Sequence, residues 1–170
     1  KLKKKRQRGI LYSVNSWNGK FYNHTNENAE DFKIDISDSL EKPIWKTFIS
    51  AKDEVLIGGL TFLKNWILRS ETSDALDKLF VKNVTTGIEE ELIFSDESVY
   101  VPGASLMQRD KNTDEIYLSY SSPKTQSRVY SYNLRTKKKS LVKEQEIPTG
   151  HNPDDYIIER IDCKSHDGRL

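Results

Sequence analysis

The sequence of 170 residues has few of the features that mark membrane, secreted or disulfide-bonded proteins. Its one cysteine, Cys163, excludes an internal disulfide and has no cysteine partner for a structural zinc site. The longest apolar stretch, residues 55–60, contains two glycines and is far shorter than the roughly 20 residues that cross a bilayer. These absences favour a water-soluble protein without a membrane partner, and we expect it in the reducing cytoplasm.

A surplus of charge of one sign is also missing. Lys and Arg number 27 against 26 Asp and Glu, so the net charge is +1 and the basic excess typical of nucleic-acid binders is absent. The basic clusters at residues 1–8 and 137–139 are interpreted as a solvated end and a solvated turn. We therefore expect no nucleic-acid partner.

What the sequence does contain is a succession of short segments with the composition of β-strands. They are rich in Val, Ile, Thr and aromatic residues, and clusters of Asn, Asp, Gly, Ser and Lys separate them. No segment has a sustained apolar period of 3.6 residues, so the predicted fold class is all-β. The expected strands are residues 9–14, 19–24, 31–36, 45–49, 55–63, 65–70, 78–84, 91–94, 99–107, 115–121, 128–134, 141–143 and 156–163.

These segments recur at a nearly constant spacing. Phe21, Trp66 and Ile116 each begin a second strand, with separations of 45 and 50 residues. A period of roughly 40 to 50 residues with four strands per unit is typical of β-propeller blades. The expected third strands contain Phe32, Phe80 and Tyr130, and the expected fourth strands contain Trp45, Leu92 and Leu141.

The repeats predict a partial β-propeller over residues 1–146, with three four-stranded antiparallel blades at about residues 8–50, 51–96 and 97–146. Propellers have about four to eight blades, so we expect the open edges of three blades to favour self-association. Residues 147–155 hold two prolines and a glycine and are interpreted as a linker. One strand, residues 156–163, and a turn at residues 166–168 are expected to follow it.

No complete active site is visible in the sequence. The segment closest to a Gly-x-Ser-x-Gly nucleophile motif has Met107 in place of the second glycine and no helical pattern after it, so Ser105 is interpreted as a strand residue. The histidines, His24, His151 and His166, lack the short spacings of metal ligands. We predict no catalytic or metal-binding residue and no cofactor.

One segment resembles a calcium-binding loop in its first residues only. It begins at Asp110, but Glu115 stands where the loop needs glycine, and Ser121 stands where it needs a bidentate ligand. We interpret it as a polar connection between two strands.

Several segments, taken together, resemble one known family. Residues 159–168, which follow a Pro-x-x-Tyr step at residues 153–156, resemble the junction between propeller and α/β-hydrolase domain in prolyl oligopeptidases. Residues 117–123 and 129–134 resemble the last blade of that family. The oligopeptidase B branch, also called protease II, is the most similar one, and Phe21-Tyr22, Gly59-Leu60-Thr61-Phe62 and Trp66-Ile67 fit its preceding blades.

The resemblance implies a parent serine endopeptidase of the cytosol that hydrolyses short peptides after Lys or Arg. Its propeller, of about seven blades, acts as a size filter over the active site. The resemblance also implies that residues 156–170 begin a truncated catalytic domain. The implied partners are the missing blades, the hydrolase domain and, in the intact enzyme only, short basic peptides.

Because the Ser-Asp-His triad is absent, we expect this chain alone to be inactive. Two alternatives remain open. In the first, the chain is a stand-alone propeller-like module for protein interaction. In the second, it is one half of an enzyme and complements a separately encoded catalytic half.

Overall fold

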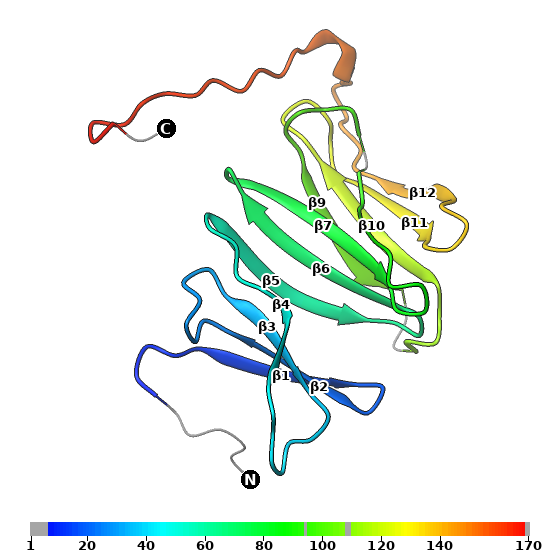
Figure 1. Cartoon of the computed structure of the whole chain (residues 1–170). Helices are drawn as coiled ribbons and strands as arrows, with labels where there is room; N and C mark the ends of the chain where they lie inside the picture. Colours follow the sequence, from blue (N-terminus) through cyan, green and yellow to red (C-terminus); the bar gives the residue numbers. More distant parts are fainter. Residues whose placement is uncertain (1–6, 94, 108–109, 169–170) are drawn as a thin grey trace. The chain divides into compact units, whose positions relative to one another are not determined.

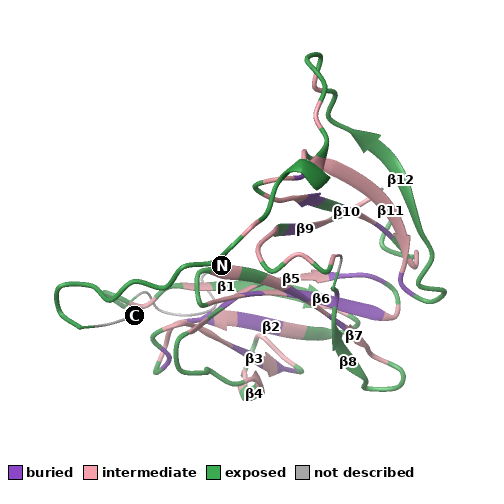
Figure 2. Ribbon diagram, turned by 90° about the horizontal axis from the view of Figure 1, so that it is seen from above, coloured by how far each residue is buried: buried purple, intermediate pink, exposed green. Residues whose placement is uncertain are grey.

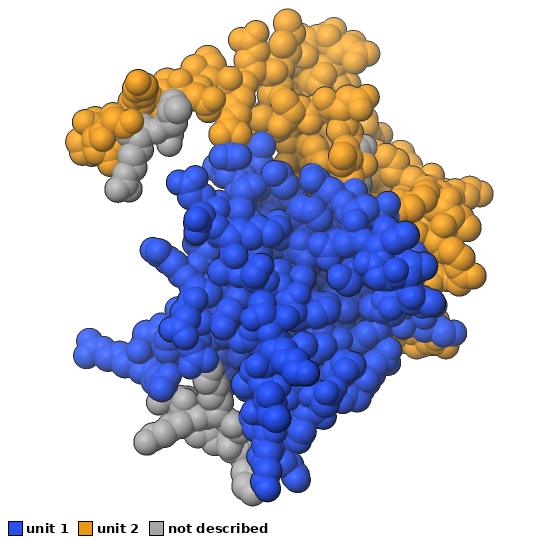
Figure 3. Space-filling view, viewed as in Figure 1, with its two compact units in different colours: residues 1–91 blue, residues 92–170 orange. Residues whose placement is uncertain are grey.

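The structure, a computed structural model, describes residues 7–93, 95–107 and 110–168. In these residues twelve strands form three four-stranded antiparallel sheets, each with its strands in sequence order (Figure 1). The expected all-β fold with three four-stranded sheets is therefore confirmed. The chain divides into two compact units, residues 1–91 and residues 92–170 (Figure 3), and each is described by itself.

The first sheet begins with a tight hairpin at Asn18-Gly19. These residues have φ angles of 47° and 72°, and Asn-Gly is the sequence that tolerates two positive φ values in a two-residue hairpin turn. The polar turn that the sequence indicates at this position thus joins the first two strands. The strands of this sheet are β1 (Tyr12–Trp17), β2 (Lys20–Thr25), β3 (Lys33–Ser37) and β4 (Lys46–Ile49).

The second sheet contains the most buried strand of the first unit, β6 (Figure 2). The pairing of β5 with β6 is irregular between Ile57 and Leu60, where Gly58 lies against Ser70. The strands of this sheet are β5 (Val55–Phe62), β6 (Trp66–Ser73), β7 (Leu76–Asn83) and β8 (Glu89–Glu91).

The core of the first unit is formed by apolar side chains from both of its sheets. Each of these side chains is at most 4% exposed, and alternation along the strands places them on one face of each sheet. Partly buried residues, Trp17 and Phe48 among them, pack around this core. The core residues are Tyr22 and Ile34 of the first sheet and Ile57, Phe62 and Ile67 of the second.

The second unit contains the third sheet. Ile116, Leu118 and Leu134 are at most 1% exposed, whereas β12 is exposed along its whole length (Figure 2). A single 3-10 helix, η1 (Pro153–Asp155), follows the sheet among the described residues. The strands are β9 (Val101–Leu106), β10 (Glu115–Ser121), β11 (Arg128–Asn133) and β12 (Lys139–Glu144).

The second and third sheets repeat one turn between their third and fourth strands. Asn83 Oδ1 accepts hydrogen bonds from the backbone amides two and three residues later, and Asn133 Oδ1 does the same. In both turns the residue four positions after the asparagine donates its amide to the asparagine carbonyl at 2.8 Å and has a positive φ. That residue is Gly87 in the second sheet and Lys137 in the third. The two asparagines are 50 residues apart, so the sequence period corresponds to a repeated local structure.

Some boundaries differ from those that the sequence predicts. Phe32, Trp45 and Leu92 were expected inside strands, and each lies one residue outside the observed strand, β3, β4 and β8 respectively. Phe32 has a φ of 67°, a left-handed backbone that ends regular strand pairing before β3. Phe94, part of an expected strand, and the basic residues 1–6 lie outside the described part of the chain.

The strand expected at residues 156–163 is wrong, because the described chain pairs no strand with this segment. A strand needs a hydrogen-bonded neighbour, and the side chains of Ile157 and Ile161 are 88% and 78% exposed. The turn that follows is present, with the Gly168 amide donating to the Ser165 carbonyl at 2.9 Å. None of the described residues forms a helix long and apolar enough to cross a membrane.

Candidate functional site

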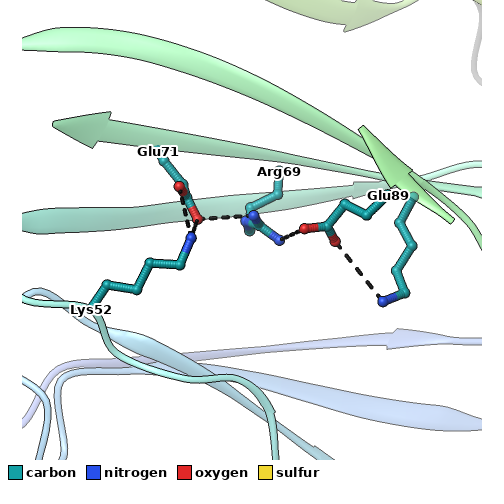
Figure 4. A network of polar contacts seen from close by, with 5 residues as sticks. Lys52, Arg69, Glu71 and Glu89 are labelled. Carbon is teal, nitrogen blue, oxygen red and sulfur yellow. Dashed lines mark hydrogen bonds and ion pairs between the residues drawn. The ribbon is translucent and has the colours of Figure 1, made fainter. Parts of the chain in front are cut away.

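The densest group of charged side chains among the described residues lies in the first unit and centres on Arg69 (Figure 4). Arg69 Nη2 is 2.9 Å from Glu71 Oε1, and Arg69 Nη1 is 3.0 Å from Glu89 Oε1. Lys52 Nζ donates to both oxygens of Glu71, at 2.8 and 3.2 Å. Lys82 Nζ is 4.0 Å from Glu89 Oε2. These five residues are called the Arg69 network below.

Strand alternation explains why these charges meet. Arg69 and Glu71 are two residues apart on β6, so their side chains share the sheet face of the core residue Ile67. Phe80 is directly opposite Arg69 in the register of β6 and β7. The Arg69 guanidinium carbon is 4.8 Å from the centroid of the Phe80 ring, so the charge rests on an aromatic face.

Burial makes this network energetically important. The side chains of Arg69 and Glu71 are only 4% and 5% exposed, and Arg69 Nε is buried without a hydrogen-bond partner among the described contacts. Removing one member of a buried pair leaves the other charge desolvated and costs several kcal/mol. Each carboxylate contacts two cations, so the network is suited to holding strands and the segment before β5 together.

This network was not predicted from the sequence. The expected strand at residues 65–70 ended before Glu71, which separated the two partners. The available signal was a pair of opposite charges at alternate positions, Arg69 and Glu71, directly after the apolar run Trp66-Ile67-Leu68. Glu89 and Lys52 come from other segments, and only the strand register and the chain path bring them close.

The structure places Ser105 within β9, directly paired with Tyr117 of β10. The strand-turn-helix context of a nucleophile is not formed there. Likewise, Glu115–Ser121 is the regular strand β10, which does not curve into a calcium-binding loop. No group of His, Cys, Asp and Glu suited to a metal occurs among the residues described.

The three histidines lie apart and have different surroundings. His24 Nε2 is 2.7 Å from the Ile57 carbonyl oxygen, and its ring stacks on Phe32, so it connects the two sheets of the first unit. His151 Nε2 is 2.6 Å from the Lys124 carbonyl oxygen within the second unit. His166 lies exposed in the turn near the carboxyl end.

Residues 147–155, predicted as a linker, form no strand in the structure. The ring of His151 stacks on Tyr156, with centroids 5.2 Å apart. Asn152 Oδ1 accepts a hydrogen bond from the Asp154 amide at the start of η1. His151 thus attaches this segment to the loop between β10 and β11.

Three consecutive four-stranded antiparallel sheets, each with its strands in sequence order, define the chain as part of a β-propeller. The family model described as the prolyl oligopeptidase N-terminal β-propeller domain matches residues 1–145. The chain belongs to this family, as the resemblance in its sequence predicts.

Individual relatives agree with this assignment. The chain is 27% identical over 167 residues to dipeptidyl aminopeptidase BI of Pseudoxanthomonas mexicana, a match that covers 96% of this chain and 22% of the relative. Its fold is similar to that of oligopeptidase B from Trypanosoma brucei, in the closed form with covalently bound antipain. There the TM-score is 0.86 at 20% identity, covering 97% of this chain and 24% of that one.

Oligopeptidase B from Leishmania major gives a TM-score of 0.80 at 15% identity, covering 97% of this chain and 24% of that one. The chain thus spans about a quarter of the length of these solved structures and 22% of the curated relative.

Proposed function

We propose that the chain forms three blades of the propeller of a serine endopeptidase of the oligopeptidase B type. The observation that carries this proposal is the match of the propeller family over residues 1–145, which coincides with the three four-stranded sheets. In the intact enzyme the propeller admits short peptides to the hydrolase domain and excludes folded proteins. Cleavage after Lys or Arg belongs to that hydrolase domain, and the enzyme works in the cytoplasm.

The partners that follow from this proposal are the remaining blades and the hydrolase domain, with short basic peptides bound only in the intact enzyme. Nucleic acids and membranes are not among them. We assign no residue of this chain to the chemical step, because Ser105 and the three histidines lie in separate structural surroundings. The chain acts through its shape and surface.

Two experiments test the proposal. The nucleotide sequence beyond the codon of Leu170 is expected to encode a Gly-x-Ser-x-Gly motif followed by Asp and then His. The protein encoded by the whole region is expected to cleave short peptides after Lys or Arg. A folded protein that contains the same cleavable sequences is expected to stay intact. Cleavage of both at similar rates would contradict the size filter.

The 170-residue chain by itself is expected to show no hydrolysis of Arg or Lys peptide substrates. Turnover by this chain that a serine-directed covalent inhibitor abolishes would overturn the assignment. The matched control is the Ser105→Ala variant, which is expected to behave like the unchanged chain.

A second function, a stand-alone interaction module, is favoured by one observation. Strand β12 carries Leu141 and Val142 with 53% and 54% of their surface exposed, and such aliphatic residues on an edge strand are available for contact with another chain. This function predicts a stable complex of the chain with another protein, without further propeller blades. In that complex the amides of β12 become protected from hydrogen exchange.

A further inference from the structure

The first unit has a cleft of about 370 Å³ whose lining is mainly apolar. Three aromatic side chains, Trp17, Tyr22 and Phe48, contribute to this lining, together with Ile36 and Ile67. The volume lies at the lower end of the range of ligand clefts, about 300 to 1,000 Å³. The cleft therefore has room for a side chain or a small group, and its walls favour an apolar one.

The aromatic walls are held in place by contacts with one another. The Trp17 ring stacks on Phe62 with centroids 5.5 Å apart, and the Tyr22 ring is 4.8 Å from Phe62 and 5.3 Å from Phe48. Tyr22 and Phe62 are each 3% exposed, which anchors this group in the core. An aromatic ligand would meet preordered rings in offset or edge-to-face geometry.

Lysines surround the cleft. Lys20 and Lys82 line it directly, and Lys82 Nζ lies 5.6 Å above the centroid of the Phe48 ring. A second hollow of about 300 Å³ shares Lys20 and Ile36 with the cleft, so the two are neighbours. The second hollow adds Lys42 and Lys46.

Acidic side chains are scarce in these linings. No acid lines the cleft, and Asp38 is the one acid in the lining of the second hollow among the described residues. Its carboxylate lies 2.7 Å from Lys20 Nζ. The hydrogen bond and charge of Lys20 lower the pKa of Asp38, so this carboxylate stays ionised and neutralises one lysine. Lys82 pairs with Glu89 of the Arg69 network, so Lys42 and Lys46 are the lining lysines without an ion pair among the described contacts. Ile44 lies in the same lining with 75% of its surface exposed.

We propose that the cleft and the second hollow together form a docking site for an acidic peptide segment that carries a large apolar or aromatic side chain. The apolar side chain enters between Trp17, Tyr22 and Phe48. Flanking carboxylates lie over Lys42 and Lys46, which are exposed, and the attraction between opposite charges favours them there. The chain as a whole lacks a basic surplus, so a nucleic acid is disfavoured as the occupant.

The acidic peptide proposed for this site differs from the substrate that the proposed function implies, since that substrate is a basic peptide. The acidic segment would belong to a separate polypeptide that binds the propeller from outside the catalytic reaction. Binding of an acidic peptide and hydrolysis of a basic peptide can therefore be measured, and lost, independently of each other.

The test is a titration of the ¹⁵N-labelled 170-residue chain, followed through the indole N–H signal of Trp17, which the Trp17→Phe variant assigns. The probe is acetyl-Glu-Phe-Asp-amide. Acetyl-Glu-Ala-Asp-amide removes the ring, acetyl-Lys-Phe-Lys-amide reverses the charge, and an oligothymidylate represents nucleic acid. The expected result is a saturable shift with the probe and about tenfold weaker binding of the other three.

Variants locate the site. The pair Lys42→Gln and Lys46→Gln, combined, is expected to weaken binding about fivefold, because two exposed charges are lost. Ile44→Ser is expected to weaken it without disturbing the core, since this side chain is exposed. The matched controls are Lys111→Gln with Lys138→Gln, which removes the same charge from exposed positions of the second unit, and Ile161→Ser.

Equal affinity for the alanine or lysine peptides, stronger binding of oligothymidylate, or equal effects of the site and control variants would each overturn the proposal. Dispersion of the backbone amide signals in every variant shows whether it is folded. A downstream sequence without a catalytic triad would refute the peptidase function and leave this site unaffected.

Discussion

At the scale of single residues, the structure separates side chains that hold the fold from those open to solvent. Arg69 is 4% exposed and contacts Glu71, Glu89 and the Phe80 ring, whereas the Lys20–Asp38 pair lies at the surface. The N–O distance is 2.9 Å in the Arg69–Glu71 pair and 2.7 Å in the Lys20–Asp38 pair, so both pairs are short. Burial, and not distance, therefore decides how much each pair contributes to stability.

Arg69→Met is expected to reduce the free energy of unfolding by about 3 kcal/mol, because it leaves the buried Glu71 and the more exposed Glu89 without their shared cation. Urea denaturation followed by fluorescence measures this loss. Lys20→Met, which removes an exposed cation, is the matched control and is expected to leave the midpoint nearly unchanged. Equal midpoints for the two variants would contradict a stabilising role of the Arg69 network.

Lys137→Gly is expected to stabilise the second unit by up to about 1 kcal/mol. Lys137 has a φ of 60°, and the equivalent position of the other repeated turn is Gly87, with a φ of 75°. Gly87→Lys, the reciprocal variant, is expected to destabilise. Thermal unfolding of both variants checks the pair, and a shift of the same sign in both would refute the repeated-turn interpretation.

Glu97 is expected to make stability depend on pH. Burial raises its pKa, but hydrogen bonds from the hydroxyls of Ser122, Tyr120 and Thr125 outweigh burial and lower the pKa overall. Thr125 Oγ1 donates to Glu97 Oε1 at 2.9 Å. A carboxyl whose pKa is lowered on folding stabilises the folded state above its unfolded pKa and loses this contribution as pH falls through the folded pKa.

Urea midpoints measured from pH 7 down to about pH 3 should therefore fall less steeply for Glu97→Gln than for the unchanged chain below the ordinary glutamate value near 4.5. Glu115→Gln, an exposed position on β10, is the control. Identical slopes for the unchanged chain and Glu97→Gln would show that Glu97 does not contribute.

At the scale of strands, close contact between neighbours sets which residues a sheet accepts. Gly58 of β5 and Gly103 of β9 each lie against a serine of the next strand, Ser70 and Ser119. A Cβ added at Gly58 would lie 2.0 Å from Ser70 Oγ and 2.9 Å from the Ser70 carbonyl oxygen. At Gly103 the clash, 2.2 Å, involves Ser119 Oγ, which a change of side-chain rotamer can move away.

Gly58→Ala is therefore expected to destabilise more than Gly103→Ala, by about 1 to 3 kcal/mol. The Ser70 carbonyl oxygen that faces Gly58 cannot move without disturbing the pairing of β5 and β6. Adding Ser119→Ala to Gly103→Ala should restore stability, whereas adding Ser70→Ala to Gly58→Ala should restore it only in part. Equal rescue at both sites would contradict this difference.

At the scale of the whole molecule, the described part of the chain forms three four-stranded sheets, whereas propellers close with about four to eight. Aliphatic side chains on its strands remain exposed, among them Leu56 at 44%, Val101 at 60% and Val142 at 54%. Blades in a ring cover such residues with their neighbours. We propose that the isolated chain covers them by binding a second copy.

Size-exclusion chromatography with light scattering is therefore expected to give a mass above that of one chain, falling on dilution. Val101→Ser with Val142→Ser should shift the equilibrium towards the single chain, since both side chains are exposed. A single-chain mass at every concentration, with a cooperative thermal transition, would show that three blades suffice alone.

Part of the fold and of the site was predictable from local sequence. Alternating apolar residues and the turn residues Asn18-Gly19 indicated strands and hairpins, and the 50-residue spacing of Asn83 and Asn133 reflects a repeated turn. The interpretation of Ser105 as a strand residue also agrees with its position in β9. These features depend on residues close in the chain, whose conformations turn chemistry and side-chain alternation control.

The all-β class, the three sheets and the family follow from the amino-acid sequence, because strand period and turn spacing repeat along the chain. Three other features depend on the folded chain: residues 156–163 form no strand, Arg69 contacts Glu89, and Lys20 and Lys82 line the cleft with Trp17 and Phe48. Each of these outcomes depends on which distant segment supplies a partner. Strand pairing and burial are settled between segments, and no local pattern encodes them.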